Sequence, residues 1–153
     1  MVEIRLPNVP YKEALEAYLR ALFSVLSPRF VILYGSAARG DFGVGSDVDL
    51  LVVADGLPEK FDDRLKLLFC INPTTAPIEP IGYTLEEFEE LLGRRHATVL
   101  FALEEGIVLY DDGSFLGVKE KFEKLKRELK IVRGKVGWYV EKMLAECLSE
   151  HSI

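Results

Sequence analysis

The feature that most constrains this chain is a pair of short apolar runs separated by a glycine-rich polar connection. The first run covers residues 30–34 and stops at Gly35, and the second covers residues 50–53, directly after Asp47 and Asp49. Short apolar runs bounded by glycine and polar residues are typical of buried strands. The sequence therefore predicts two strands of one sheet, joined by a polar loop that ends in two carboxylates.

The two carboxylates are spaced to hold a metal ion. Because side chains alternate across a strand, Asp47 and Asp49 leave the same face, about 6 to 7 Å apart along the backbone. Two carboxylates on one face repel each other, and a divalent cation beside them removes that repulsion. Hard oxygen ligands suit Mg²⁺ or Mn²⁺ rather than zinc.

The start of the loop, at Gly35 and Ser36, supplies a second kind of site. A strand ends there, and a short helix is predicted to run from it to Arg39. Backbone N–H groups at a helix start attract anions, and glycine lets a phosphate approach the main chain closely. An anion site beside a metal site indicates a bound nucleoside triphosphate. Each element alone is common in ordinary turns, so the prediction depends on their combination.

The run from Gly35 to Leu50, in which Gly-Ser is followed after ten residues by Asp-x-Asp, resembles the signature of minimal nucleotidyltransferases of the DNA polymerase beta superfamily. Those proteins are also known as the MNT partners of HEPN proteins. The resemblance is specific over residues 30–55 and weaker over residues 11–112. It implies metal-dependent transfer of a nucleotidyl group, expected to be AMP from ATP, to a hydroxyl acceptor with release of pyrophosphate.

The resemblance also implies roles for individual residues. Asp47 and Asp49 would hold Mg²⁺ or Mn²⁺ ions, one bound to the triphosphate and the other lowering the pKa of the attacking hydroxyl. Gly35 and Ser36 would cradle the phosphates, and Ser46 would add a further nucleotide contact.

Two further residues each have two interpretations. Arg39 either neutralises charge on the departing pyrophosphate or pairs with Asp41 or Asp49 as a structural strut. Glu79 is a lone acid in an otherwise uncharged run that contains two prolines. It either faces solvent on an edge strand or completes the site as a third metal ligand, the role that a carboxylate on this strand plays in the family.

The remaining pattern predicts class α+β or α/β, with a small mixed sheet of about four or five strands flanked by helices. Apolar spacings of three and four indicate helices, and further short apolar runs indicate strands. The predicted helices cover residues 11–26, 59–70, 84–92 and 98–103, and the predicted further strands cover residues 76–83 and 107–110.

The end of the chain has a different pattern. From Val118 to Met143, apolar residues recur at alternating spacings of four and three, which predicts a long helix with a kink or break near Gly134. We therefore divide the chain into a nucleotidyltransferase domain, residues 1–112, and a C-terminal helical extension, residues 113–153. That helix would pack on its own domain, on a second copy in a homodimer, or on another protein.

Composition limits the ligands and the compartment. The formal net charge of -6 argues against long nucleic acid as the main ligand. Cys70 and Cys147 have no metal-binding spacing and are expected to be reduced, buried thiols. We find no basic-then-apolar leader and no apolar run long enough to span a bilayer, so we expect a cytoplasmic protein.

A chain this small leaves recognition of the acceptor to another molecule. In the family that this sequence resembles, the acceptor can be a tyrosine of the HEPN partner, and the transfer silences that partner's ribonuclease. The alternative hypothesis is a binding module, an antitoxin-like regulatory subunit of a HEPN-type toxin pair, whose affinity lies in the C-terminal helix and which has little or no catalysis.

Overall fold

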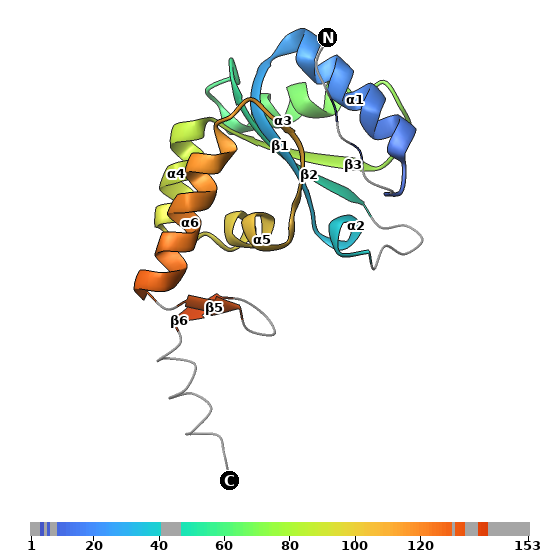
Figure 1. The fold of residues 1–153 in the computed structure, drawn as a ribbon. Coiled ribbons are helices and arrows are strands. Elements are labelled where there is room, and N and C mark those ends of the chain that lie inside the picture. The colour runs from blue at the N-terminus through green and yellow to red at the C-terminus, as the bar shows by residue number, and fades with distance from the viewer. Residues whose placement is uncertain are drawn as a thin grey trace.

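The structure is a computed structural model that describes residues 4, 6, 9–40, 47–129, 131–133 and 138–140. Helices and strands alternate along most of the chain (Figure 1). In order, the elements are α1 (Lys12–Val25), β1 (Ser27–Tyr34), α2 (Ser36–Arg39), β2 (Val48–Asp55), α3 (Phe61–Cys70), β3 (Ile78–Tyr83), α4 (Leu85–Gly93), α5 (Ala97–Glu105), β4 (Ile107–Asp111), α6 (Phe115–Leu129), β5 (Ile131–Arg133) and β6 (Trp138–Val140).

The main sheet has four strands in the order β3-β2-β1-β4. Strand β1 pairs antiparallel with both β2 and β4, whereas β2 and β3 run parallel. The predicted mixed sheet flanked by helices is confirmed. Strand β3 lies at the sheet edge, where Pro80 is tolerated because only one side of the strand must pair.

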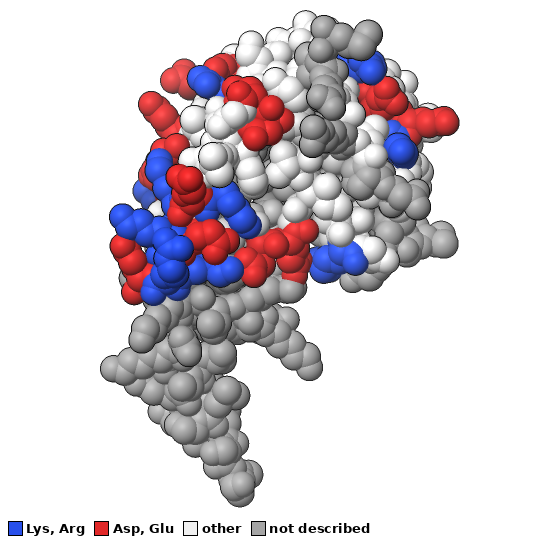
Figure 2. Space-filling model, in the orientation of Figure 1, with Lys and Arg blue, Asp and Glu red and all other residues white. Residues whose placement is uncertain are grey.

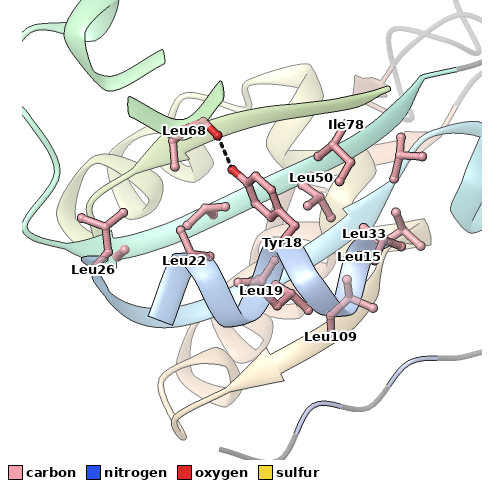
Figure 3. Packing of buried hydrophobic residues seen from close by; sticks show 14 of the residues in the cluster. Leu15, Tyr18, Leu19, Leu22, Leu26, Leu33, Leu50, Leu68, Ile78 and Leu109 are labelled. Carbon is pink, nitrogen blue, oxygen red and sulfur yellow. Dashed lines mark hydrogen bonds between the residues drawn. The ribbon is translucent and has the colours of Figure 1, made fainter. Parts of the chain in front are cut away.

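Helices cover both faces of this sheet, and each face has its own apolar core (Figure 1). On one face, α1 and α3 pack on the sheet, and Figure 3 shows the Tyr18 hydroxyl donating to the Leu68 carbonyl oxygen at 2.7 Å there. On the other face, α4, α5 and α6 supply Phe88, Leu100 and Phe122, all fully buried. Because the two central strands are covered on both sides, they read as continuous apolar runs in the sequence.

The C-terminal extension departs from the prediction beyond Leu129. Helix α6 ends there, and strands β5 and β6 form a separate two-stranded antiparallel sheet. The prediction of helix is therefore wrong for residues 131–133 and 138–140. The physical reason is that β-branched and aromatic residues in both segments favour strand, while Gly134 and Gly137 between them cost about 1 kcal/mol each in a helix. The rest of the predicted helix lies outside the described residues.

The described part of α6 packs on its own domain. Val118 and Phe122, which belong to the predicted apolar stripe, are buried in the core between the sheet and α4, α5 and α6. The outer side of α6 carries mixed charge (Figure 2), since four of its lysines pair with glutamates of α4, α5 or α6. This side is therefore a surface of alternating charge rather than a basic stripe.

Of the two cysteines predicted to be buried, the structure describes one. Cys70, predicted to be buried, is exposed. It ends α3 two positions after the buried Leu68, and at 3.6 residues per turn two positions lead to the opposite side of a helix. Cys147 lies outside the described residues. None of the described helices is long and apolar enough to cross a membrane.

Candidate active site

Three neighbouring strands bring Tyr34, Asp49 and Glu79 into one row across the sheet. Asp49 of β2 is in register with Tyr34 of β1 on one side and with Glu79 of β3 on the other. Residues opposite one another on adjacent strands project to the same face, with their Cβ atoms about 5 Å apart. The structure therefore places Glu79 beside Asp49, as one of its two interpretations expected, and also exposed on the edge strand, as the other expected. Its role as a metal ligand stays a prediction.

The row lies on the face of the sheet that α4, α5 and α6 cover. Along β2, Leu51 and Val53 pack into the core on that face, and Asp49 precedes them by the period of two that a strand imposes. Val48 and Leu50 face the opposite core. Alternation alone thus places the carboxylate at the end of an apolar strand face, beyond the part that packs into the core.

Asp47 adds a third carboxyl group at the start of β2. It is exposed and lies close enough to Glu79 to act on its carboxyl group. Desolvation, followed by the charge of Asp47, side-chain hydrogen bonding with Asp47 and the charge of Asp49, raises the pKa of Glu79. Burial and the charge of Asp47 likewise raise the pKa of Asp49, opposed by the positive charge of Arg39. The charge of Asp47 therefore disfavours ionisation of both Asp49 and Glu79.

This donor set fits a hard divalent cation. Carboxylate oxygens are the preferred ligands of Mg²⁺, and a cation among them would relieve the repulsion that raises the two pKa values. Among the described residues, no three acidic, histidine or cysteine side chains are gathered in a geometry that would already hold a metal ion. The chemistry of the donors, rather than a preformed cage, is what fits the ion.

Gly35 lets the chain turn directly against Asp49. Its backbone has φ 73° and ψ -154°, a conformation that is essentially restricted to glycine. A Cβ atom placed on Gly35 would overlap the Asp49 carboxylate. The Gly35 carbonyl then accepts hydrogen bonds from the N–H groups of Ala38 and Arg39, both at 3.1 Å. The predicted short helix is thus the single turn α2, which begins beside Asp49.

Arg39, at the end of α2, lies near two acidic groups. Its Nη1 atom is 3.5 Å from Oε2 of Glu105, the last residue of α5. Its charge also acts on Asp49, as described above. Among the described residues, Glu105 is therefore an ion-pair partner of Arg39, and the strut interpretation, which named Asp41 or Asp49, stays a prediction. Asp41 lies outside the described residues, as does Ser46, the predicted nucleotide contact.

Sequence reasoning missed Tyr34 and Glu105. Burial, followed by the charge of Asp49, Tyr83 and Glu79, raises the pKa of Tyr34 to about 12. The sequence feature that could have identified Tyr34 is its position as the last residue of the apolar run before Gly35, opposite the Asp-x-Asp segment. The signal for Glu105 was an acid at a helix C-terminus, where the helix dipole disfavours negative charge and a cation must compensate.

A family model described as a nucleotidyltransferase domain matches residues 13–148. Two Methanocaldococcus jannaschii relatives are provisionally named protein adenylyltransferases. MJ1305 is 38% identical over 72 residues, which cover 40% of this chain and 49% of MJ1305. MJ0604 is 34% identical over 109 residues, which cover 65% of this chain and 97% of MJ0604. The chain thus spans about half the length of MJ1305 and nearly all of MJ0604.

Solved structures with a partial likeness to this chain include a toxin–antitoxin crystal structure with AMP-PNP, at 17% identity and a TM-score of 0.47, covering 75% of this chain and 91% of the other. Another is provisionally named a nucleotidyltransferase and comes from Sulfolobus solfataricus, at 20% identity and a TM-score of 0.40, covering 66% of this chain and 89% of the other. On the strength of the family model and of MJ0604, the chain belongs to the nucleotidyltransferase domain family, and the predicted enzyme class is confirmed at the level of that family.

Proposed function

We propose that this protein transfers AMP from ATP to a hydroxyl group of a protein acceptor and releases pyrophosphate. The observation that carries the proposal is the register of Asp49 with Glu79, with Asp47 near Glu79 and the Gly35 turn packed against Asp49. The provisional names of the two M. jannaschii relatives support AMP as the group and protein as the acceptor.

The bonds that change are those at the α-phosphorus of ATP. An acceptor oxygen would form a new bond to that phosphorus, and the bond from the phosphorus to the oxygen that bridges to the β-phosphate would break. Pyrophosphate would leave with the electron pair of that bond, and the acceptor's proton would be lost to solvent. When bound by Asp47, Asp49 and Glu79, Mg²⁺ or Mn²⁺ would supply positive charge to the phosphates and lower the pKa of the attacking hydroxyl.

The chain's own groups would hold the triphosphate in place. The first N–H groups of a helix have no acceptor within the helix, so those of α2 can point at an anion beside Gly35. Ser36 would add its hydroxyl. Arg39, whose side chain is 41% exposed, would meet the negative charge of the phosphates and of the leaving pyrophosphate.

The alternative hypothesis, an antitoxin-like binding subunit, placed its affinity in the C-terminal helix. Val118 and Phe122, which belong to the apolar stripe of that helix, are buried in this protein's own core. The described part of the stripe therefore gives the binding hypothesis no surface of its own. We propose a HEPN-type protein as the acceptor, because in the family that the sequence resembles the acceptor can be a tyrosine of such a protein.

The test is transfer of label. Purified protein, Mg²⁺, α-labelled ATP and a cell extract as the source of acceptors should give a labelled protein band. The double variant Asp47→Asn/Asp49→Asn should abolish the band. Asp55→Asn is the matched control, because Asp55 lies on the same strand but is exposed and pairs with Arg29 at 3.0 Å, away from the row. Equal labelling by the double variant would refute the assignment of the carboxylates.

Partner neutralisation distinguishes the two functions. If wild-type protein with ATP silences a toxin-like partner and the double variant does not, then silencing requires nucleotidyl transfer. Silencing by the double variant without nucleotide would show that binding alone is enough.

A further inference from the structure

Helix α2, which carries Arg39, is a single turn and cannot be held by its own hydrogen bonds alone. It spans four residues, and its closing bonds are the N–H groups of Arg39 and Gly40 to the carbonyls of Gly35 and Ser36. One turn fixes several dihedral angles for very few hydrogen bonds, so short helices depend on tertiary contacts. Ala37 provides one such contact, since it is buried in the core beneath α1.

The second contact is made by Glu105, whose position is set by the core. Helix α5 packs through Val99 and Leu103, and its chain leaves through Gly106. A Cβ atom at Gly106 would overlap the Ala102 carbonyl and the Ile32 side chain of β1. The end of α5 is therefore pressed directly on the sheet, which leaves the Glu105 backbone little freedom to shift.

The two acids that end α5 have different partners. Glu104 is 33% exposed and pairs with Lys126 of α6 at 2.8 Å. Glu105 is only 13% exposed and pairs with Arg39 of α2 at 3.5 Å. An acid at a helix C-terminus opposes the helix dipole, and burial adds to that cost. The Arg39 guanidinium supplies the compensating charge.

We infer that Glu105 is a positioning residue, which holds Arg39 at the end of the turn that we propose binds phosphate, beside the carboxylate row. Glu105 belongs to helix α5, which is packed against the core. Arg39 belongs to the single turn α2, which depends on tertiary contacts. Without the Glu105 charge, the Arg39 guanidinium is drawn to the nearby Asp49 carboxylate, and the turn loses its anchor on α5. The consequence for ATP rests on the proposed function, whereas the consequence for the turn does not.

Two measurements on the full chain test the inference. Glu105→Gln should raise the dissociation constant of a non-hydrolysable ATP analogue with Mn²⁺ about tenfold, the usual scale of one charge-assisted interaction. It should also speed amide hydrogen exchange at Arg39 and Gly40 by a similar factor, because those N–H groups close the turn. Glu104→Gln is the matched control and should change neither quantity more than about twofold, the effect of a surface ion pair.

A double variant separates positioning from a general loss of stability. If Glu105 acts through Arg39, then Arg39→Gln/Glu105→Gln should bind the analogue no more weakly than Arg39→Gln alone. Additive losses, or Glu105→Gln behaving like Glu104→Gln in both measurements, would overturn the inference. If wild-type protein takes up no analogue, the proposed function fails, and the exchange rates still decide whether Glu105 anchors the turn.

Discussion

A cluster of charged side chains lies near each end of strand β3. Toward the C-terminal end, Arg64 of α3 is 4% exposed and donates to the Pro58 carbonyl at 3.0 Å, the Gly82 carbonyl at 3.2 Å and a Glu87 carboxylate oxygen at 2.8 Å. Near the N-terminal end, Glu79 faces Asp47 and Asp49. One cluster balances a buried cation with acceptors, whereas the other brings three carboxyl groups together.

The pKa shifts express the same contrast. Burial would raise the pKa of Glu87, but hydrogen bonds from Thr84 and Arg64 outweigh it, and the pKa is lowered. The pKa values of Asp49 and Glu79 are raised. A cluster in which hydrogen bonds and opposite charges balance a buried ion stabilises the fold. A cluster of like charges lowers stability unless a bound ligand compensates its charge, which is typical of functional sites. The comparison therefore distinguishes two clusters at opposite ends of β3. The Arg64 cluster is a structural junction between α3, β3 and α4, and the Glu79 cluster is the candidate active site.

The largest effect on stability is expected at the structural junction. Arg64→Met should lower the free energy of unfolding by about 3 kcal/mol, because two carbonyls lose their donor and Glu87 loses its cation. Denaturant titration measures this change. Arg20→Met, which removes an exposed pair with Glu16, is the control and should cost no more than about 0.5 kcal/mol. If both variants lose similar amounts of unfolding free energy, the buried Arg64 contacts contribute no more to stability than an exposed ion pair.

The next effect concerns the turn against Asp49. Gly35→Ala should cost about 2 kcal/mol and abolish uptake of an ATP analogue, because the backbone conformation is strained for alanine and the new Cβ meets the Asp49 carboxylate. Gly40→Ala is the matched control, since Gly40 also has positive φ, 82°, but open space around its Cα. It should cost about 1 kcal/mol and retain uptake. Calorimetric titration and thermal melts of both variants give the comparison.

A smaller effect of opposite sign is expected at the carboxylate row. With a chelator present, Asp49→Asn should stabilise the protein by up to about 1 kcal/mol, because it removes a like charge beside Glu79 and Asp47. Activity should be lost in the same variant. Denaturant titration in EDTA measures the gain, and a clear loss of stability would show that Asp49 supports the fold rather than a ligand.

The smallest effect is the pH dependence, and the two clusters should differ in its sign. The lowered pKa of Glu87 gives stability that is present above its unfolded value and lost as pH falls through its folded value. The raised pKa values of Asp49 and Glu79 do the reverse, costing stability as pH rises through them. In EDTA, unfolding titrations from pH 7 down to about pH 3 should therefore show a smaller loss of stability in acid for Glu87→Gln than for wild type, and a larger one for Glu79→Gln.

Much of the fold follows from local pattern. The helix predicted over residues 84–92 is present as α4, and Thr84 and Glu87, three residues apart, form a capping box at its start with both hydrogen bonds made. The apolar runs of β1 and β2 and the helix through Tyr18 and Leu22 follow from period. The extension beyond Leu129 was mispredicted because its apolar spacing suited a helix while its residue types suited strands, and pairing between β5 and β6 decided the outcome.

The amino-acid sequence by itself determined the donors: two aspartates two positions apart at the start of one strand, a glycine where the chain must turn tightly, and an acid on the next strand along the chain. Those features depend on alternation and on backbone freedom, which act within a few residues. Only the tertiary structure decided that Tyr34 and Glu79 flank Asp49 and that Glu105 pairs with Arg39. Strand order, register and helix docking bring those residues together, and they arise from packing between segments that local pattern leaves unspecified.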